Sequence, residues 1–74
     1  DGKLDINARY NLALAYELKD QIATAEKWLD AAYDLAASYR SKDDLKRIVN
    51  YQKALDTRKK QINRLNQYQD ENPR

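Results

Sequence analysis

The feature that most constrains this chain is where its helix breakers lie. Only one of the 74 residues is glycine and only one is proline, and these are Gly2 and Pro73, one at each end. Both residue types interrupt helices, because glycine is too flexible and proline lacks a backbone donor. Between them, Ala, Leu, Lys, Gln and Arg dominate together with Asp, and all but Asp are good helix formers. We therefore predict an all-α chain in which only polar turns separate the helices.

The spacing of apolar residues predicts three helices, at residues 7–19, 22–39 and 42–69. Asp5 is expected to cap the first helix, and Ser41 with the acidic residues after it resembles a capping box for the third. The first turn contains Asp20, which tolerates the left-handed conformation that glycine often provides.

Two small residues, Ala25 and Ala32, indicate that the first two helices approach each other closely as an antiparallel hairpin. We expect the first half of the third helix to pack on this hairpin. Its second half has few apolar residues and is expected to project. Five residues are predicted to be buried: Leu12, Tyr16, Ala25, Leu29 and Ala32.

The composition argues against catalysis. Cys and His are both absent, which removes the usual zinc ligands, thiol nucleophiles and imidazole bases. Asp30 and Asp34 lie four apart, but a solvated acidic helix face explains them better than a carboxylate pair for acid–base chemistry or metal binding. We expect no catalytic residue, cofactor or metal site, and no apolar run approaches the roughly 20 residues that span a bilayer. The compartment stays open between the bacterial cell envelope and the cytoplasm.

Residues 7–37 resemble a tetratricopeptide repeat. That family has a spaced pattern of leucine, small residue, tyrosine, alanine, large apolar residue and alanine. All six spaced positions match here, although Arg9 replaces the leading Trp and Ala37 the closing Pro. The matching residues are Leu12, Ala13, Tyr16, Ala25, Leu29 and Ala32. The resemblance implies a helical hairpin that binds a protein or peptide partner.

A second repeat should begin about 34 residues later, but Lys46 and Arg47 stand where leucine and a small residue belong. We therefore interpret residues 42–69 as a capping helix that ends a solenoid. The chain reads as one domain from a longer protein with tetratricopeptide repeats upstream. A further resemblance, to the C-terminal part of certain bacterial cell-envelope lipoproteins of unknown function, rests on Tyr51, Leu55 and Arg58.

Charge is unevenly distributed along the chain. Residues 1–37 hold four basic and seven acidic residues, for a net charge of −3, whereas residues 38–74 hold ten basic and five acidic ones, for +5. The asymmetry indicates either a partner surface or attraction between neighbouring helices. Lys46, Lys53 and Lys60 recur every seven residues, and Arg64 extends the stripe. A solvated outer face is the favoured explanation, and nucleic-acid binding is the alternative.

The first helix supplies the other candidates for partner contact. Tyr10, Leu14 and Leu18 lie off the line that faces the second helix, so we expect some of them to be exposed or covered by an earlier repeat or a second copy. Asn11 lies on the face that lines the inner groove in the resembled family. The partner-binding candidates are Tyr10, Asn11, Leu14, Leu18, Lys46, Lys53 and Lys60. Tyr39 and Tyr68 are further candidates, and self-association through Ile62 and Leu65 is a third possibility beside peptide and nucleic-acid binding.

Overall fold

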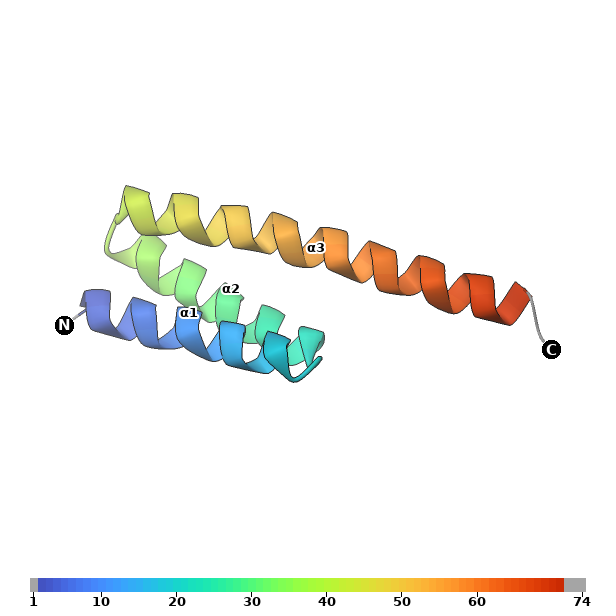
Figure 1. The fold of residues 1–74 in the computed structure, drawn as a ribbon. Coiled ribbons are helices and arrows are strands. Elements are labelled where there is room, and N and C mark those ends of the chain that lie inside the picture. Colours follow the sequence, from blue (N-terminus) through green and yellow to red (C-terminus); the bar gives the residue numbers. More distant parts are fainter. Residues whose placement is uncertain (1, 72–74) are drawn as a thin grey trace.

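The computed structural model describes the backbone of residues 2–71 and the side chains of residues 4–65. It contains three helices, α1 (Gly2–Leu18), α2 (Ile22–Ser38) and α3 (Lys42–Glu71). No strand occurs within residues 2–71, so the all-α prediction is confirmed. Helices α1 and α2 lie side by side and run in opposite directions, and α3 returns beside them and extends well past their end (Figure 1).

The two turns between helices are built alike. Asp20 and Arg40 both adopt the left-handed conformation, with φ of 61° and 55°. In each turn the next backbone N–H donates to the carbonyl five residues earlier, which satisfies a free carbonyl at the helix end. The pairs are Gln21 with Tyr16 at 2.9 Å and Ser41 with Ala36 at 3.0 Å. The predicted role of Asp20 is confirmed, while nothing in the sequence pointed to Arg40.

The first helix begins earlier than predicted. It starts at Gly2, so Asp5 lies within the first turn and does not cap the helix. The ring of Tyr39 lies where a side chain on Gly2 would stand, and this contact holds the start of α1 against the end of α2. The boundaries of the other two helices differ from the prediction by one or two residues. At the start of α3, the Ser41 hydroxyl donates to Asp44 Oδ2 at 2.6 Å.

The core is centred on α2, because α2 alone packs its backbone closely against both other helices. Ile6 and Ala13 face it from α1, and Ile48 and Leu55 face it from α3, all of them buried. The α2 members of the core are Ala25, Leu29, Ala32 and Ala36, each with 0% exposure. Burial of Ala25, Leu29 and Ala32 is thus confirmed.

One core prediction is wrong, since Leu12 is 37% exposed. The structure turns Ala13 toward the interior instead, and successive residues of a helix point about 100° apart. Leu12 therefore lies on the flank of α1. Tyr16 is half-buried and packs against the core. Ile6, which lies just before the helix predicted at residues 7–19, is 1% exposed and belongs to the core.

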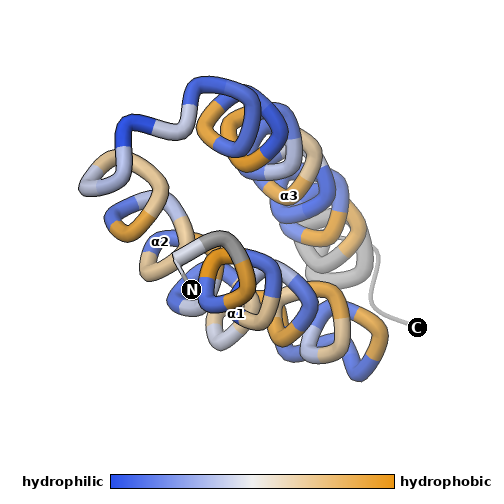
Figure 2. Tube along the Cα trace, turned by 90° about the vertical axis from the view of Figure 1, so that its left-hand side faces the viewer, coloured by the Kyte–Doolittle hydropathy of each residue, from blue (hydrophilic) through white to orange (hydrophobic). Residues whose placement is uncertain are grey.

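The two halves of α3 differ as expected. Ile48 and Leu55 are buried, whereas Ile62 and Leu65, further along, are 37% and 63% exposed. Figure 2, viewed nearly along the helices, shows hydrophobic positions recurring along all three of them. The projecting part of α3 accounts for the elongated shape, whose longest extent is 54 Å. Within the described residues, none of the helices has the length and hydropathy needed to cross a membrane.

The close approach of the helices to α2 leads to a stability prediction. Replacing Ala32, which is fully buried, with leucine should overpack the core and cost about 1–3 kcal/mol of the free energy of unfolding. Thermal denaturation followed by circular dichroism would show this as a lower melting temperature. The exposed Ala37→Leu on the same helix is the control and should change the stability by less than about 0.5 kcal/mol. Equal melting temperatures for the two variants would contradict the packing.

Candidate interaction surfaces

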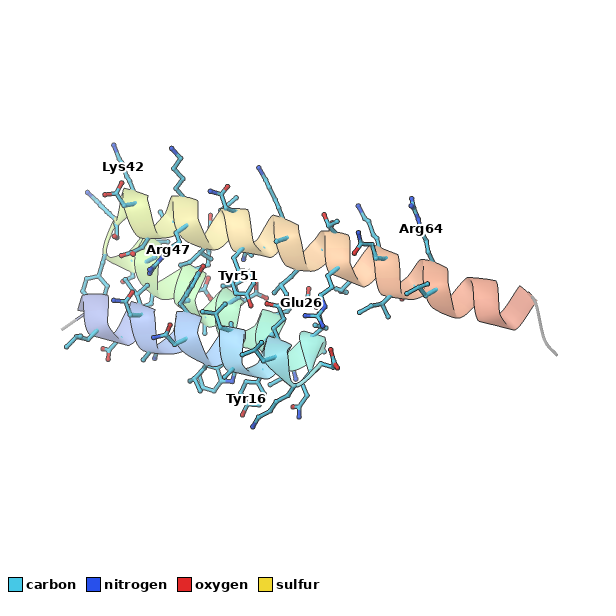
Figure 3. The ribbon with its side chains drawn as sticks, in the orientation of Figure 1. Tyr16, Glu26, Lys42, Arg47, Tyr51 and Arg64 are labelled. Carbon is cyan, nitrogen blue, oxygen red and sulfur yellow. The ribbon has the colours of Figure 1, made fainter. Side chains whose placement is uncertain are left out.

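A row of polar and aromatic side chains joins α3 to α1. The backbones of these two helices stay further from each other than either does from the backbone of α2. Arg47, Tyr51 and Arg58 contribute to it from α3, where their spacing of four and seven places them on one face. Figure 3 shows Arg47 and Tyr51 directed toward the hairpin. We call this row, together with its partners on α1 and in the first turn, the α1–α3 clasp. The partners are Asn7, Tyr10, Glu17 and Asp20.

The half of the clasp nearer the start of α1 is built around Tyr10. Its ring centroid lies 5.3 Å from that of Tyr51, with the planes tilted by 54°. The guanidinium of Arg47 stands 4.4 Å from the centroid of the Tyr10 ring, within cation–π range. Arg47 also donates to Asn7 Oδ1 at 2.7 Å and to Asp44 Oδ1 at 3.1 Å. Tyr10, a candidate for partner binding, is therefore half-buried and engaged with α3.

The half of the clasp nearer the end of α1 is an ion-pair network. The Tyr51 hydroxyl donates to Glu17 Oε1 in a short hydrogen bond. Arg58 donates to Glu17 Oε2 at 2.9 Å and to Asp20 Oδ1 at 2.6 Å, so one guanidinium reaches both the last turn of α1 and the turn after it. Charge-assisted hydrogen bonds of this length are stronger than neutral ones. The network anchors α3 beside the turn that joins α1 to α2.

Two pKa values are shifted within this network. The hydrogen bond from Tyr51 lowers the pKa of Glu17 below its usual range, and Arg58 lowers it further. Burial raises the pKa of the Tyr51 hydroxyl, and the hydrogen bond to Glu17 adds to the rise. Shifted groups in a cleft can mark catalytic sites. Here Tyr51 donates to Glu17, and Glu17 also accepts from Arg58, so the arrangement serves the packing of α3.

Part of the charge asymmetry of the sequence is used inside the molecule. Glu17 and Asp20 pair with Arg58, and Glu26 of α2 pairs with Lys59 at 3.1 Å. Acidic side chains of the hairpin thus meet basic side chains of α3. Attraction between neighbouring elements, one of the two explanations left open by the sequence, accounts for these charges.

The side of α1 turned away from the core is exposed and apolar. Leu14 is 38% exposed and Leu18 87% exposed, as expected for candidates that the hairpin cannot cover. Leu4, at 67%, belongs to the same side and was not foreseen, because the predicted helix began after it. Leu4 stands seven residues before Asn11, and this helical spacing was the signal in the sequence that could have placed Leu4 on the same side of α1. We call this surface the outward face of α1, and its members are Leu4, Ala8, Asn11, Leu14, Ala15 and Leu18, all exposed.

The basic stripe of α3 lies on the opposite surface of the molecule. Lys46, Lys53 and Lys60 are exposed, and Lys60 pairs along its own helix with Asp56 at 3.3 Å. Figure 3 shows Lys42 and Arg64 pointing away from the hairpin. Their helical spacing from the three lysines places all five residues on the same side of α3. The stripe is therefore accessible to an anionic surface.

An open groove of about 450 Å³ lies at the step where α3 runs past the first turn. Its apolar lining comes from Ile22, Ala23 and Ile62, and Lys59 and Asn63 line it as well. Ile62 is 37% exposed and Ala23 is also exposed, so the groove is a surface feature.

Acidic residues do not gather into a metal site in the part of the chain that the structure describes. Asp30 accepts a hydrogen bond from Gln52 of α3 at 3.3 Å, and Asp34 is exposed on the same helix. Tyr39 is 58% exposed beyond its contact with Gly2, and Tyr68 falls outside the described side chains.

The lowered pKa of Glu17 predicts how stability depends on pH. The carboxylate form is favoured in the folded chain, so its contribution is present above the usual pKa of 4.5 and is lost as the pH falls through the lowered value. Glu17→Gln should therefore melt at a lower temperature than the wild type at pH 7, and this difference should shrink on acidification to about pH 3. The exposed Asp34→Asn is the control. A Glu17→Gln difference that stays constant with pH would contradict the network.

Comparison with known proteins adds one match. Residues 1–57, which comprise the hairpin and the first half of α3, match the model of a family described as Domain of unknown function (DUF6340). Neither the curated proteins nor the solved structures contain a match to the chain. The matched residues span most of the sequence and include every buried side chain of the core. The chain therefore belongs to this family, whose function is not established.

Proposed function

We propose that this domain is a non-catalytic protein–protein interaction module, a scaffold of tetratricopeptide type that ends in the capping helix α3. The observation that carries the proposal is the outward face of α1, where Leu4, Leu14 and Leu18 are 67%, 38% and 87% exposed. An exposed apolar strip, interrupted here by Asn11, is typical of a protein contact site.

Most residues of the tetratricopeptide signature are buried or half-buried, which supports a hairpin of this type. Ala13, Ala25 and Ala32 have 0% exposure, and small residues at these positions let the two helix backbones approach. Leu29 is also fully buried, and Tyr16 is half-buried. Leu12 departs from the pattern because it lies on the flank of α1. The proposal therefore rests on the five other signature positions.

Residue chemistry supports a non-enzymatic role. The chain contains neither His nor Cys. The two groups with shifted pKa values, Glu17 and Tyr51, are bonded to each other in the clasp. Catalytic acids and bases need a proton-exchanging position within reach of a substrate, and this pair is occupied by its structural contacts.

A second candidate function is nucleic-acid binding through the basic stripe. The exposed Lys46, Lys53 and Lys60 favour it, since they lie about 10 Å apart along a straight helix. Against it stands the position of Tyr51, the one aromatic residue between Lys46 and Lys60 in the sequence. Its hydroxyl is bonded to Glu17 in the clasp, whereas stacking of aromatic rings on bases is a main source of single-strand affinity. Peptide or protein binding remains the favoured function.

Site-specific photo-crosslinking tests the proposed function in the cells that make the protein. A photoreactive amino acid at position 18, in place of the exposed Leu18, should give adducts that protease removes and nuclease does not. The same group in place of Lys53 is the matched control on the opposite surface. Adducts only from position 53 would contradict the assignment of the outward face.

A salt titration tests the alternative. If the stripe binds duplex nucleic acid, the logarithm of affinity should fall with the logarithm of salt by about 0.9 per phosphate neutralised. Changing Lys46, Lys53 and Lys60 together to alanine should then flatten that slope. No retention on heparin or duplex DNA at low salt would remove this candidate and leave the protein partner.

A further inference from the structure

The basic residues of α3 divide into two sets according to the side of the helix on which they lie. Arg47, Arg58 and Lys59 lie toward the hairpin, and each of them forms an ion pair. The other five are exposed and make up the basic stripe: Lys42, Lys46, Lys53, Lys60 and Arg64. Among residues 4–65, only Lys60 of these five forms an ion pair, with Asp56 of its own helix. The charges that hold α3 in place are thus separate from the charges that it presents outward.

The basic stripe is narrow and straight. At about 100° per residue, its five cations fall within about 40° of one another around the axis of α3. They span residues 42–64 of one continuous helix, a length of about 33 Å. The acidic residues nearest to the stripe, Asp43 and Asp56, lie about 60–80° to either side of its centre. A narrow line of cations with acidic flanks fits a partner that is anionic and flat along the whole line.

We propose that the basic stripe of α3 binds the anionic headgroups of a lipid bilayer, with α3 lying along the membrane surface. Bilayers that contain anionic lipids attract basic residues near their surface, and each residue strengthens binding by about fivefold. Five such residues together strengthen it by about 10³-fold. The side chains of the stripe are all charged, so the contact is electrostatic and stays at the level of the headgroups. This inference goes beyond the proposed function and does not depend on it.

A duplex nucleic acid fits the stripe less well. A helix that enters the major groove has base edges in front of it and phosphates along both of its flanks. Here the cations stand at the front, and the nearest charges on the two flanks are the carboxylates of Asp43 and Asp56. A helix laid across the outside of a duplex touches only a short length of a curved surface, so few of the five cations reach phosphates. A bilayer is flat over the whole length of the stripe.

An acidic partner helix fits the stripe less well too. Exposed ion pairs contribute little to binding in water, and helices that pack together bury an apolar stripe. Ile48 and Leu55, the buried apolar residues of α3, are already packed against the core. The outer side of α3 therefore offers charge alone. A bilayer suits such a surface, because its negative potential acts on all five cations at once.

The orientation of α3 leaves the outward face of α1 available. Lys42 and Arg64 point away from the hairpin (Figure 3), so a bilayer on that side contacts α3 and not α1. The two surfaces belong to different helices and differ in chemistry, one apolar and one basic. One molecule can therefore hold a protein through α1 while α3 lies on a membrane.

Vesicle sedimentation with the full chain tests the proposal. Vesicles of phosphatidylcholine and phosphatidylglycerol in equal parts should bind the chain at low salt, and added salt should release it. Vesicles of phosphatidylcholine alone should leave it in solution. Changing Lys46, Lys53 and Arg64 together to glutamine should weaken binding to the anionic vesicles about 100-fold. All three side chains are exposed, so the core should stay folded, which circular dichroism can verify.

The matched control removes the same charge from the hairpin. Changing Arg9, Lys19 and Lys27 together to glutamine also lowers the net charge by three. These side chains belong to the hairpin, on the other side of α3 from the membrane, so screening by salt weakens their effect and binding should stay within about threefold of the wild type. Equal losses in the two triple variants, or a wild type that does not bind the anionic vesicles, would overturn the proposal. Tighter retention of the wild type on duplex DNA than on these vesicles at the same salt would assign the stripe to nucleic acid instead.

Fluorescence quenching tests which surface meets the bilayer. The chain has no cysteine, so Asn50→Cys beside the stripe and Ala8→Cys on the outward face of α1 each provide one labelling site. Both positions are exposed. On anionic vesicles with a quencher attached to the headgroups, the label at position 50 should be quenched more strongly than the label at position 8. The reverse order would show that the apolar face of α1 meets the membrane, and the assignment to the basic stripe would fall.

Discussion

The whole arrangement depends on how closely other helices can approach α2. Ala25, Ala32 and Ala36 have no exposed surface, because the backbones of α1 and α3 come near enough to cover residues with only a methyl group. This makes α2 the only helix packed along both neighbours. A chain of this length buries a modest share of its surface, and the fully buried large side chains are Ile6, Leu29, Ile48 and Leu55. The apolar core is therefore thin and centred on one helix.

The α1–α3 clasp supplements that core where α2 does not reach. Because the backbones of α1 and α3 stay apart, only long side chains can bridge them, and Arg47, Tyr51 and Arg58 do so. Arg58 is about one-third exposed, so water screens part of its attraction to Glu17 and Asp20. Its geometry still matters, since one planar guanidinium holds both acceptors and so sets the rotation of α3 about its own axis.

This use of charge decides which surfaces remain for other molecules. Three of the hairpin acids, Glu17, Asp20 and Glu26, are engaged by α3. The surfaces left outside include an uncharged apolar strip on α1 and a basic stripe on the far side of α3. The two surfaces have different chemistry and face opposite directions, so one variant on each can separate an apolar protein contact from an electrostatic one.

The sequence by itself determined the local features of this protein. Helix breakers confined to the ends, apolar residues at helical spacing and polar turns were enough to predict three helices and the left-handed turn at Asp20. The burial of Ala25, Leu29 and Ala32 and the exposure of Leu14 and Leu18 also followed from the pattern. Such features depend on neighbours within one or two turns of the same helix, which a single sequence displays directly.

Only the tertiary structure decided how the helices are rotated against one another. It turned Ala13 inward and Leu12 outward, although both are adjacent members of the same signature. It also brought Glu17 to Tyr51 and Arg58, across separations of 34 and 41 residues. A change in helix rotation of about 100° exchanges one residue for the next at a contact. That rotation follows from packing all three helices at once, and no local spacing contains it.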